Sequence, residues 1–575
     1  MGIALLKLAV YLGILGLLIK PVGLYMARVF LHEPCGLDFI LSPVEQLIYK
    51  FCTVQPKQGM HWKTYATSLL KFNFLGILLA YFLLRLQGYL PFNPQHIVGV
   101  NPIDAFNTAI SFTTNTNWQV YNPETDISYL STMLVLTVQN FLSAATGIAV
   151  LMALIRGFTK NNSESIGNFW VDLVRAVLYI LLPLAFILAL VLVSQGVIQN
   201  LKPAVMATPI DLSVIQGSQV LPMGPAASMV AIKQLGSNGG GFFNANSAHP
   251  FENPTPLVNL IEMLAILLLP AALCYTFGVL VKRTLNGVIL LFAMFMIFVP
   301  LTILDIYFEK ELNPALTQMG VAKNATSNFY PGGNMEGKET RLGVVESAIW
   351  AVATSASSNG STNASLDSFM PLAGGIPLWL IELGEVIFGG VGLGLCGMLV
   401  MVMLTAFIAG LMVGRTPSFL GKKIEPFEMK MMVIYVLLPI ILTILLTAIA
   451  CVTKMGTDAI LNKGPHGLTE ILYAFSSMAN QNGSSFAGLN ASTPFYSISG
   501  AMLMLITRYA GIVAILALAG SLAQKNTHAE TIGTLATTTP IFMVLLICII
   551  IVIGALAFLP VLVLGPFIEH LRLFA

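Results

Sequence analysis

Long apolar stretches alternate with short polar connections along the whole chain. A helix needs roughly 20 apolar residues to cross a bilayer, and ten stretches reach that length. They are residues 1–30, 65–90, 127–155, 176–201, 256–281, 284–304, 377–414, 431–453, 495–523 and 532–568. The pattern predicts an all-α polytopic membrane protein with about ten transmembrane helices.

Four short polar loops interrupt this pattern at nearly equal spacing. They occupy residues 113–117, 237–241, 357–361 and 480–484, and we number them loops 1 to 4 in chain order. Anchored on Asn115, Asn238, Asn359 and Asn482, they recur at intervals of 123, 121 and 123 residues. Each loop follows a segment too short to cross a bilayer, at residues 102–112, 224–236, 343–356 and 466–479.

Each repeat is therefore expected to contain a span, a half-helix, a polar loop and a second span. We place four such pore repeats at residues 65–168, 169–283, 284–429 and 430–528. One extra span remains at each terminus, in residues 1–64 together with a cytoplasmic loop, and in residues 529–575. Four near-equal units predict a pseudo-symmetric arrangement around a central pore.

The loops have the chemistry of a cation filter. Non-helical backbone at membrane depth is tolerated only where it is buried in protein or lines water. Rings of carbonyl oxygens can replace the hydration shell of a monovalent cation, whereas Mg²⁺ and Ca²⁺ favour carboxylates, which these loops lack. The candidate filter residues are Thr114, Asn115, Thr116, Ser237, Asn238, Gly239, Ser358, Asn359, Gly360, Gln481, Asn482 and Gly483. The alternative is four ordinary surface turns, some carrying the N-x-[ST] glycosylation pattern.

Composition supports the membrane assignment and limits the partners. The chain is 56% hydrophobic and 9% charged, whereas about a quarter of the residues in a soluble protein are charged. No basic patch is interleaved with aromatic residues, so nucleic acid is not an expected partner. The six cysteines form no CxxC pair, which indicates neither a disulfide framework nor a cysteine metal site.

The distribution of lysine and arginine predicts the orientation. Basic residues gather around residues 28–63, 156–175, 282–283 and 415–430, whereas residues 87–126 contain none. Residues 310–341 are an exception, with four. Because basic loops favour the cytoplasm, we expect the four polar loops to open outward and both termini to lie outside.

One stretch is specific enough to suggest a family. Residues 241–254 read Gly-Phe-Phe-Asn-Ala-Asn-Ser-Ala-His-Pro-Phe-Glu-Asn-Pro. This resembles the signature of the channel-like, potassium-translocating subunit of the Kdp transporter, a bacterial potassium-pumping ATPase complex. Residues 114–119, 388–392, 413–417 and 482–489 resemble the same family, and the similarity extends through essentially the whole chain.

The resemblance implies a pump that is divided between subunits. A channel-like protein in the bacterial plasma (inner) membrane would take potassium from outside and pass it through an intramembrane tunnel to a P-type ATPase subunit. Small accessory membrane subunits would complete the complex, and potassium would be the transported ion, with no permanently bound cofactor. The preference for potassium over sodium follows from the resemblance alone. A stand-alone potassium channel or an ion-coupled symporter with the same plan is the alternative.

The sequence itself offers no site for ATP chemistry. It contains neither a GxxxxGK[ST] phosphate loop nor an Asp-Lys-Thr-Gly phosphorylation site. Its longest loop, near residues 307–343, is shorter than the roughly 50 residues that a separate domain needs. We therefore assign no catalytic residue to this chain and expect ATP hydrolysis to belong to the partner.

Several charges fall inside the expected spans. Glu382 and Glu385 lie in residues 377–414, and Arg508 lies in residues 495–523. Intramembrane charges are costly and usually face an opposite charge, a cavity or the interior. We expect Glu385 and Arg508 to approach each other or the ion path below the filter. The alternative is two unrelated charges that reach the membrane surface or bond to backbone.

Glycines crowd the same stretch, at positions that include Gly389 and Gly390. Each glycine weakens a helix by about 1 kcal/mol relative to alanine, so the run predicts a broken helix. The resemblance favours a loop beneath the third filter that blocks direct passage to the cytoplasm; close helix packing through small residues is the alternative. Arg415 would add an electrostatic barrier at that exit or anchor the helix end at the lipid headgroups.

Other polar side chains lie near the expected outer mouth. Gln119 follows loop 1 and would hold the filter by hydrogen bonds or satisfy a neighbouring carbonyl; the resemblance makes it a determinant of ion affinity. Glu124 and Asp126 would attract cations or simply lie in a solvated loop. His249 has no second ligand at a useful spacing, so we assign it a structural role.

Overall fold

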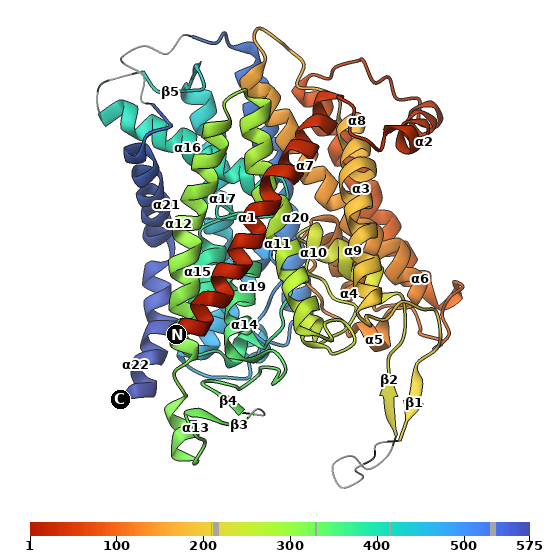
Figure 1. The fold of residues 1–575 in the computed structure, drawn as a ribbon, viewed down its shortest axis with the longest axis vertical. Helices are drawn as coiled ribbons and strands as arrows, with labels where there is room; N and C mark the ends of the chain where they lie inside the picture. The colour runs from red at the N-terminus through yellow and green to blue at the C-terminus, as the bar shows by residue number, and fades with distance from the viewer. Residues whose placement is uncertain (209, 211–217, 328–329, 413, 415, 529–535) are drawn as a thin grey trace.

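Long helices form a bundle with short helices and loops at both ends (Figure 1). The computed structural model describes residues 1–208, 210, 218–327, 330–412, 414, 416–528 and 536–575. Within these residues, ten helical stretches are long and apolar enough to cross a membrane, which confirms the expected number. They are built on α1 (Gly2–Leu31), α3 (Trp62–Leu86), α7 (Val138–Thr159), α9 (Leu182–Ser194), α11 (Pro256–Leu280), α12 (Thr284–Glu309), α16 (Leu393–Met412), α17 (Pro426–Val452), α20 (Pro494–Gln524) and α21 (Pro540–Leu562).

Shorter elements extend or connect these spans. Short segments α6 (Tyr129–Ser131) and η2 (Thr132–Thr137) lead into α7, and α8 (Phe169–Arg175) and η3 (Ala176–Leu181) lead into α9. The remaining helices are α2 (Asp38–Phe51), η1 (Gln87–Tyr89), α5 (Pro123–Asp126), η4 (Asn246–Ala248), α13 (Pro314–Gln318), η5 (Leu366–Ser368), α15 (Pro371–Glu382), α18 (Lys454–Thr457), η6 (Val563–Phe567) and α22 (Ile568–Phe574), besides the four half-helices described below. Three antiparallel pairs join β1 (Val205–Ala207) to β2 (Gln219–Leu221), β3 (Asn324–Ser327) to β4 (Tyr330–Gly332), and β5 (Ser418–Phe419) to β6 (Lys422–Lys423).

Burial separates central spans from peripheral ones. In the most apolar window of the stretch that contains α7, 83% of residues are buried, against 17% in α17. Helix α7 carries Ala144, Ala145, Gly147 and Ala149 on its buried surface. Small residues let helix backbones approach closely in a membrane, so α7 packs against both α20 and α16 in the centre.

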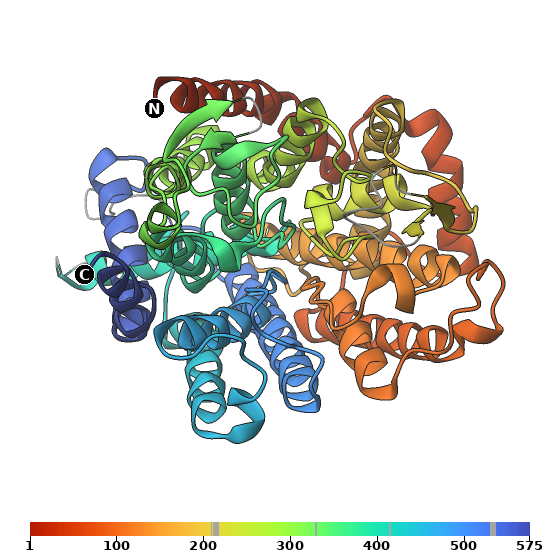
Figure 2. The ribbon, with the colours of Figure 1, turned by 90° about the horizontal axis from the view of Figure 1, so that it is seen from below.

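The four half-helices are present where the sequence predicts them. They are α4 (Pro102–Thr113), α10 (Ala226–Leu235), α14 (Gly343–Ala356) and α19 (Pro465–Ala479), and each ends directly before its polar loop. Proline starts α4 and α19, because its missing N–H is not needed at the first helical position. Seen from below, the chain runs round the centre in order, from orange through yellow and green to blue (Figure 2).

The basic connections lie together at the end of the bundle opposite the termini, where α2, the start of α8 and β5 are drawn (Figure 1). The Lys422 ammonium is buried and donates to the carbonyl oxygens of Lys160 (2.6 Å) and Lys525 (2.5 Å). These two residues follow the last turns of α7 and α20, where helix dipoles leave partial negative charge. A lysine of the predicted basic loop thus caps two spans.

The stretch at residues 377–414 is not one continuous span. Helix α15 ends at Glu382, and α16 begins at Leu393 and forms the span alone. Between them, Gly389 adopts a φ of +61° and Gly392 a φ of +89°, which glycine tolerates because it has no Cβ. The Gly389 N–H donates to the Ala356 carbonyl oxygen at 2.9 Å. The predicted broken helix is confirmed, and its non-helical part, residues 383–392, contacts the end of α14.

Gly147 tests the packing of this broken segment. A Cβ at Gly147 would overlap the Val391 carbonyl oxygen, whereas a Cβ at Gly13 of α1 would meet no atom within 4 Å. Glycine to alanine normally favours a helix by about 1 kcal/mol, so Gly13→Ala should leave thermal stability in detergent unchanged or raise it. Gly147→Ala should instead lower stability, because overpacking typically costs about 1–3 kcal/mol. Equal melting temperatures for the two variants would contradict the close contact between α7 and residues 383–392.

Candidate ion-binding site

The four loops leave their half-helices in the same way. In each case a backbone N–H in the loop donates to the carbonyl oxygen five residues earlier, inside the last turns of the helix. These donor–acceptor pairs are Thr116 with Ser111, Asn238 with Lys233, Asn359 with Thr354, and Asn482 with Ser477. The structural register therefore aligns Thr116, and not Asn115, with the other three asparagines. The alignment anchored on Asn115 is one residue out of register in loop 1, because that loop offers two asparagines.

Backbone conformation follows the same register. The residue before the aligned position has a positive φ in every loop, from +46° at Gln481 to +69° at Asn115. The residue after it also has a positive φ and is glycine in loops 2 to 4 but Asn117 in loop 1. Asparagine and glycine are the residues that tolerate this left-handed region most readily. The backbone thus explains the glycine after the aligned residue in loops 2 to 4, and the asparagine that replaces it in loop 1.

Asparagine side chains join each loop to the preceding repeat. Asn359 Nδ2 donates to the Lys233 carbonyl oxygen of α10, and Asn482 Nδ2 donates to the Thr354 carbonyl oxygen of α14, both at 3.1 Å. In both bonds the donor is the aligned asparagine of one loop, and the acceptor lies five residues before the aligned asparagine of the preceding loop. Loops 2, 3 and 4 are therefore linked in sequence by one repeated interaction.

The junction between loops 1 and 2 is different. Asn238 Nδ2 donates to Asn115 Oδ1 at 2.6 Å, and Asn115 Nδ2 donates to the Ser237 carbonyl oxygen at 2.8 Å. Asn115 Oδ1 also accepts a hydrogen bond from Ser143 of α7 at 2.8 Å. Two side chains of the candidate filter thus bond directly to each other here.

Close backbone contacts complete a ring. A Cβ on the glycine of each of loops 2, 3 and 4 would overlap a carbonyl oxygen of the next loop. The pairs are Gly239 with Asn359, Gly360 with Asn482, and Gly483 with Thr116. The last pair brings loop 4 against loop 1, so the four loops form a closed ring of contacts, which we call the filter ring.

Burial excludes the surface-turn alternative. Asn238, Asn359 and Asn482 have no exposed surface, and Asn115 is 3% exposed. The acceptor asparagines of the glycosylation patterns at Asn359 and Asn482 are therefore inaccessible in the folded protein. Non-helical backbone this deep in an apolar bundle must be satisfied by protein or by ions and water.

The electrostatics of the filter ring favour a cation. Four half-helices end at the ring, and each carries a partial charge of about −0.5 at its C-terminus. The loops themselves contain no ionisable side chain. A site of neutral oxygens, surrounded by helix C-termini, can bind a weakly hydrated monovalent cation without a carboxylate ligand.

A cavity of about 690 Å³ opens on the filter ring. Each loop contributes to its lining the residue just after the aligned one: Asn117, Gly239, Gly360 and Gly483. Polar groups such as the side chains of Asn246 and Ser484 complete much of the wall. Asp126 of α5 also lines this vestibule, and α5 is drawn at the end of the bundle where the termini lie (Figure 1). The vestibule therefore faces that end.

Gln119 joins two loops in this vestibule. Its Nε2 donates to the Gly241 carbonyl oxygen and its Oε1 accepts from the Gly241 N–H, both at 3.0 Å. Nε2 also lies 3.0 Å from the Tyr121 hydroxyl oxygen. An amide that bonds in both directions to one residue of loop 2 fixes the distance between loops 1 and 2.

The acidic residues near the mouth are held by local hydrogen bonds. Glu124 Oε1 accepts from the Asn244 N–H at 3.1 Å, and burial raises the pKa of this carboxyl. Asp126 lines the vestibule and accepts from the Asn122 N–H at 2.8 Å. His249 stacks on Phe243, with ring centroids 4.0 Å apart, in agreement with the structural role expected for it.

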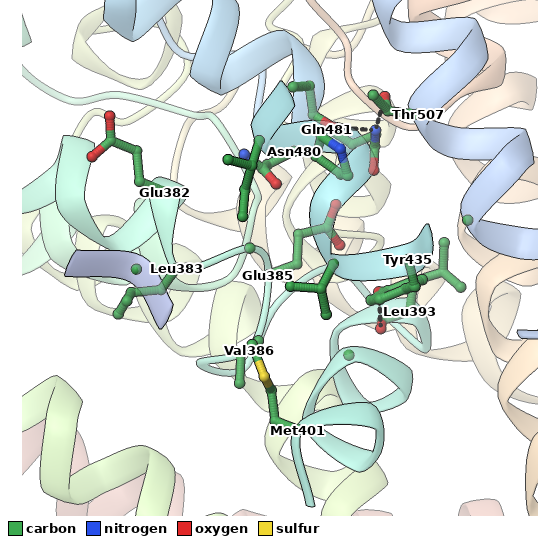
Figure 3. Close-up of a pocket in the computed structure, with 18 of the residues that line it drawn as sticks. Glu382, Leu383, Glu385, Val386, Leu393, Met401, Tyr435, Asn480, Gln481 and Thr507 are labelled. Carbon is green, nitrogen blue, oxygen red and sulfur yellow. Dashed lines mark hydrogen bonds between the residues drawn. The ribbon is translucent and has the colours of Figure 1, made fainter. Parts of the chain in front are cut away.

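A second, smaller cavity of about 50 Å³ lies beneath loop 4. Glu382, Glu385 and Arg508 all line it, together with Gln481 of the filter ring. Figure 3 places the Glu385 carboxylate on the side of the cavity that faces Asn480 and Gln481. Glu385 and Arg508 line the same cavity, but no ion pair joins the two side chains among the described residues. Both expected charges therefore meet at one cavity next to the ring.

Of the other residues expected along the ion path, all but Arg415 lie in the described part of the chain. Gly389 and Gly390 lie in the non-helical segment 383–392, which also supplies Glu385. Arg508 Nη2 donates to the Ser143 carbonyl oxygen of α7 at 3.4 Å. Arg415 lies outside the described residues.

One functional group escaped the sequence analysis. Lys233 has no exposed surface and pairs with the equally buried Glu252, and its ammonium donates to Asn246 Oδ1 at 2.6 Å. Asn246 Nδ2 in turn donates to the Gly239 carbonyl oxygen at 2.8 Å. The lysine thus holds Asn246, and Asn246 holds the backbone of loop 2 at Gly239. Its only signal in the sequence is a charge within an otherwise uncharged half-helix.

Comparisons with known proteins place these features in context. A family model described as "Potassium-transporting ATPase A subunit" matches residues 9–571. A protein of Sorangium cellulosum named potassium-transporting ATPase potassium-binding subunit is 55% identical over 573 residues, covering 99% of each chain. A protein of the same name from Methylococcus capsulatus is 52% identical, covering 99% of this chain and 98% of its own. The solved potassium transporter TrkH from Vibrio parahaemolyticus is 15% identical and covers 86% of this chain and 97% of its own, with a TM-score of 0.49.

Gly360 and Gly464 form a matched pair for testing the ring. Both have a positive φ, +87° and +83°, so alanine strains the backbone at each position. A Cβ at Gly360 would overlap the Asn482 carbonyl oxygen, whereas one at Gly464 meets nothing within 4 Å. We expect Gly360→Ala to weaken monovalent cation binding by at least about tenfold, or about 1.4 kcal/mol, with Gly464→Ala near wild type. Titration calorimetry with potassium and sodium chloride measures both, and equal affinities in the two variants would contradict the filter ring.

Proposed function

Because the chain belongs to the family of potassium-transporting ATPase A subunits, we propose that it is the potassium-binding and translocating subunit of an ATP-driven uptake pump. The observation that carries the proposal is the filter ring, a closed contact of four uncharged loops at the floor of a polar vestibule. Potassium is the transported ion and not a resident cofactor. ATP hydrolysis belongs to a P-type ATPase partner, since the sequence holds no phosphate-binding or phosphorylation motif.

In this proposal the ring takes potassium from the outside. The ligands come from residues 114–116, 237–239, 358–360 and 481–483, whose backbone and amide oxygens are uncharged. Rigid links between loops, such as Asn482 to Thr354 and Gln119 to Gly241, keep the oxygens from collapsing onto a smaller ion. Selectivity then depends on the number and field strength of the oxygens, which these links hold constant.

Below the ring, the ion leaves sideways. Residues 383–392 touch the end of α14 at Ala356 and so occupy the direct route beneath loop 3. The cavity under loop 4 offers the alternative route, and the Glu385 carboxylate there attracts the cation. Arg508 in the same cavity limits how tightly the ion binds, so the ion can pass on to the ATPase partner. For Arg415, which lies outside the described residues, an electrostatic barrier at the exit or an anchor at the lipid headgroups stays a prediction from the sequence.

The proposed orientation in the membrane follows from the distribution of charge and from the order of the helices. We place the basic end in the cytoplasm, by the positive-inside rule, and the vestibule and both termini outside. Ten apolar helices make the chain a multi-pass membrane protein, and the proposed location is the bacterial plasma (inner) membrane. Residues 65–168, 169–283, 284–429 and 430–528 are the proposed pore repeats. Small accessory membrane subunits complete the assembly.

Potassium-stimulated ATP hydrolysis is the direct test of the pump proposal. The tagged chain, purified with its partners from native membranes, should show hydrolysis that potassium stimulates and sodium does not. The complex with Gly464→Ala should keep this response, and Gly360→Ala should need at least about ten times more potassium for it. A chain that brings no ATPase with it, or hydrolysis indifferent to potassium, would instead favour a stand-alone channel or symporter.

Replacing Arg508 tests the proposed sideways route. Arg508→Met keeps the length of the aliphatic side chain but removes a charge from the wall of the lower cavity, next to Glu385. We expect normal membrane expression with ATP-driven potassium uptake reduced at least about tenfold, because the unopposed carboxylate holds the ion. Potassium binding to the ring should persist, which separates this defect from a filter defect. Wild-type uptake by Arg508→Met would eliminate this role.

A further inference from the structure

We propose that Asp367, His466 and Glu470 form a binding site for a divalent first-row transition metal ion, at the same end of the bundle as the vestibule. One potential ligand atom from each of the three lies within 4.8 Å of the other two. The residues come from three places: η5 after loop 3, the start of α19, and one turn further along α19. This site is separate from the filter ring, and the proposal does not depend on the transport function.

The distances suit a single ion between the three side chains. His466 Nε2 lies 3.0 Å from Asp367 Oδ1 and 3.9 Å from Glu470 Oε1. Zinc binds imidazole nitrogen and carboxylate oxygen at about 2.0–2.2 Å, so its ligand atoms lie about 3–4 Å apart. His466 and Glu470 are four residues apart on one helix and therefore face the same way.

A fourth residue orients the histidine. Glu569 Oε1, on the terminal helix α22, lies 2.8 Å from His466 Nδ1. A proton on Nδ1 then points at this carboxylate and leaves Nε2 available to a metal. Metal-binding histidines almost always bond through their other nitrogen to such a partner, and that partner raises the metal affinity.

A buried oxygen without a hydrogen-bond partner provides independent support for a cation site. Glu470 has no exposed surface, and its Oε2 has no hydrogen-bond partner among the described residues. Its Oε1 accepts from the Asn462 side chain at 2.8 Å. A buried carboxylate oxygen without a partner is costly, and a bound cation next to it removes that cost.

The donor set identifies the class of ion. One imidazole nitrogen with two carboxylate oxygens suits zinc or manganese, whereas magnesium and calcium prefer oxygen alone. A proton competes for the same nitrogen, because His466 Nε2 lies within hydrogen-bond distance of Asp367 Oδ1. A metal binds the deprotonated nitrogen, so binding is measured at mildly alkaline pH.

A metal here would join three segments that the chain brings together from far apart. Asp367 follows loop 3 by a few residues, and His466 begins the half-helix that ends at loop 4. Through Glu569 the site also holds α22, which packs near α19 (Figure 1). The ion would brace the outer ends of the third and fourth repeats against the C-terminal helix.

Zinc binding to the purified full-length chain tests the site. After EDTA treatment and removal of the chelator, titration with zinc at pH 8 should show one bound ion per chain and a raised melting temperature. X-ray absorption should report one nitrogen and two or more oxygens at about 2.0–2.2 Å. Manganese should bind to the same site and be displaced by zinc.

Variants distinguish ligands from their support. His466→Gln and Asp367→Asn should abolish the site, and Glu569→Gln should weaken zinc binding by about 10–100-fold while one ion still binds at saturation. His249→Gln, which changes a histidine stacked on Phe243, is the matched control and should bind zinc like wild type. Gel filtration confirms that each variant is folded.

Two results would overturn the metal site. The first is a wild-type chain that binds no zinc or manganese, which would mean that His466 is a protonated bridge between two carboxylates. The second is undiminished zinc binding by folded Asp367→Asn and His466→Gln chains, which would place the ion elsewhere.

Discussion

The structure depends on satisfying backbone groups where a helix stops inside a membrane. A half-helix that ends at membrane depth leaves carbonyl oxygens and the following N–H groups without water. Here the chain bonds back to a carbonyl oxygen in its own helix, and asparagine amides from the next loop take carbonyls such as that of Lys233. Each loop is therefore complete only when its neighbour is in place. This mutual dependence makes the four loops one site instead of four turns.

Three buried lysines also help to satisfy groups near the ends of helices. Lys233 supports the chain behind loop 2, Lys422 caps the ends of α7 and α20, and Lys338 pairs with Glu309 below the aromatic ring of Phe369. An ammonium without exposed surface is stable only with close partners. Lys422 bonds to backbone carbonyl oxygens directly, whereas Lys338 and Lys233 act through side chains that hold backbone groups. These side chains are Glu309, which accepts from the Met370 N–H, and Asn246, which donates to the Gly239 carbonyl oxygen. These three buried charges thus support segments close to where helices end.

Much of the fold follows from the sequence because membrane spans and half-helices are local features. Length, hydropathy and the recurring Asn-Gly pairs are sufficient to predict ten spans, four half-helices and a break near Gly389. The register within loop 1 cannot be predicted in this way, because neither asparagine of Thr-Asn-Thr-Asn occupies the aligned position. The bond from the Thr116 N–H to the Ser111 carbonyl oxygen places Thr116 there. Clusters such as that of Asp367, His466 and Glu569 combine residues far apart in sequence, and no local pattern predicts their meeting.

The filter ring is not fully symmetric, and its asymmetry gives the proposed route a direction. Asn238 bonds to Asn115, whereas Asn359 and Asn482 bond to helix carbonyls of the preceding repeat. Gln119 and the supports of loop 2 tighten the junction of the first two repeats. The lower cavity lies on the opposite side, beneath loop 4, with Glu385 and Arg508 in its wall. An ion released from the ring therefore meets fixed hydrogen bonds on one side and a charged cavity on the other. In the proposed function, this asymmetry fits an ion that binds from above and leaves sideways through the lower cavity.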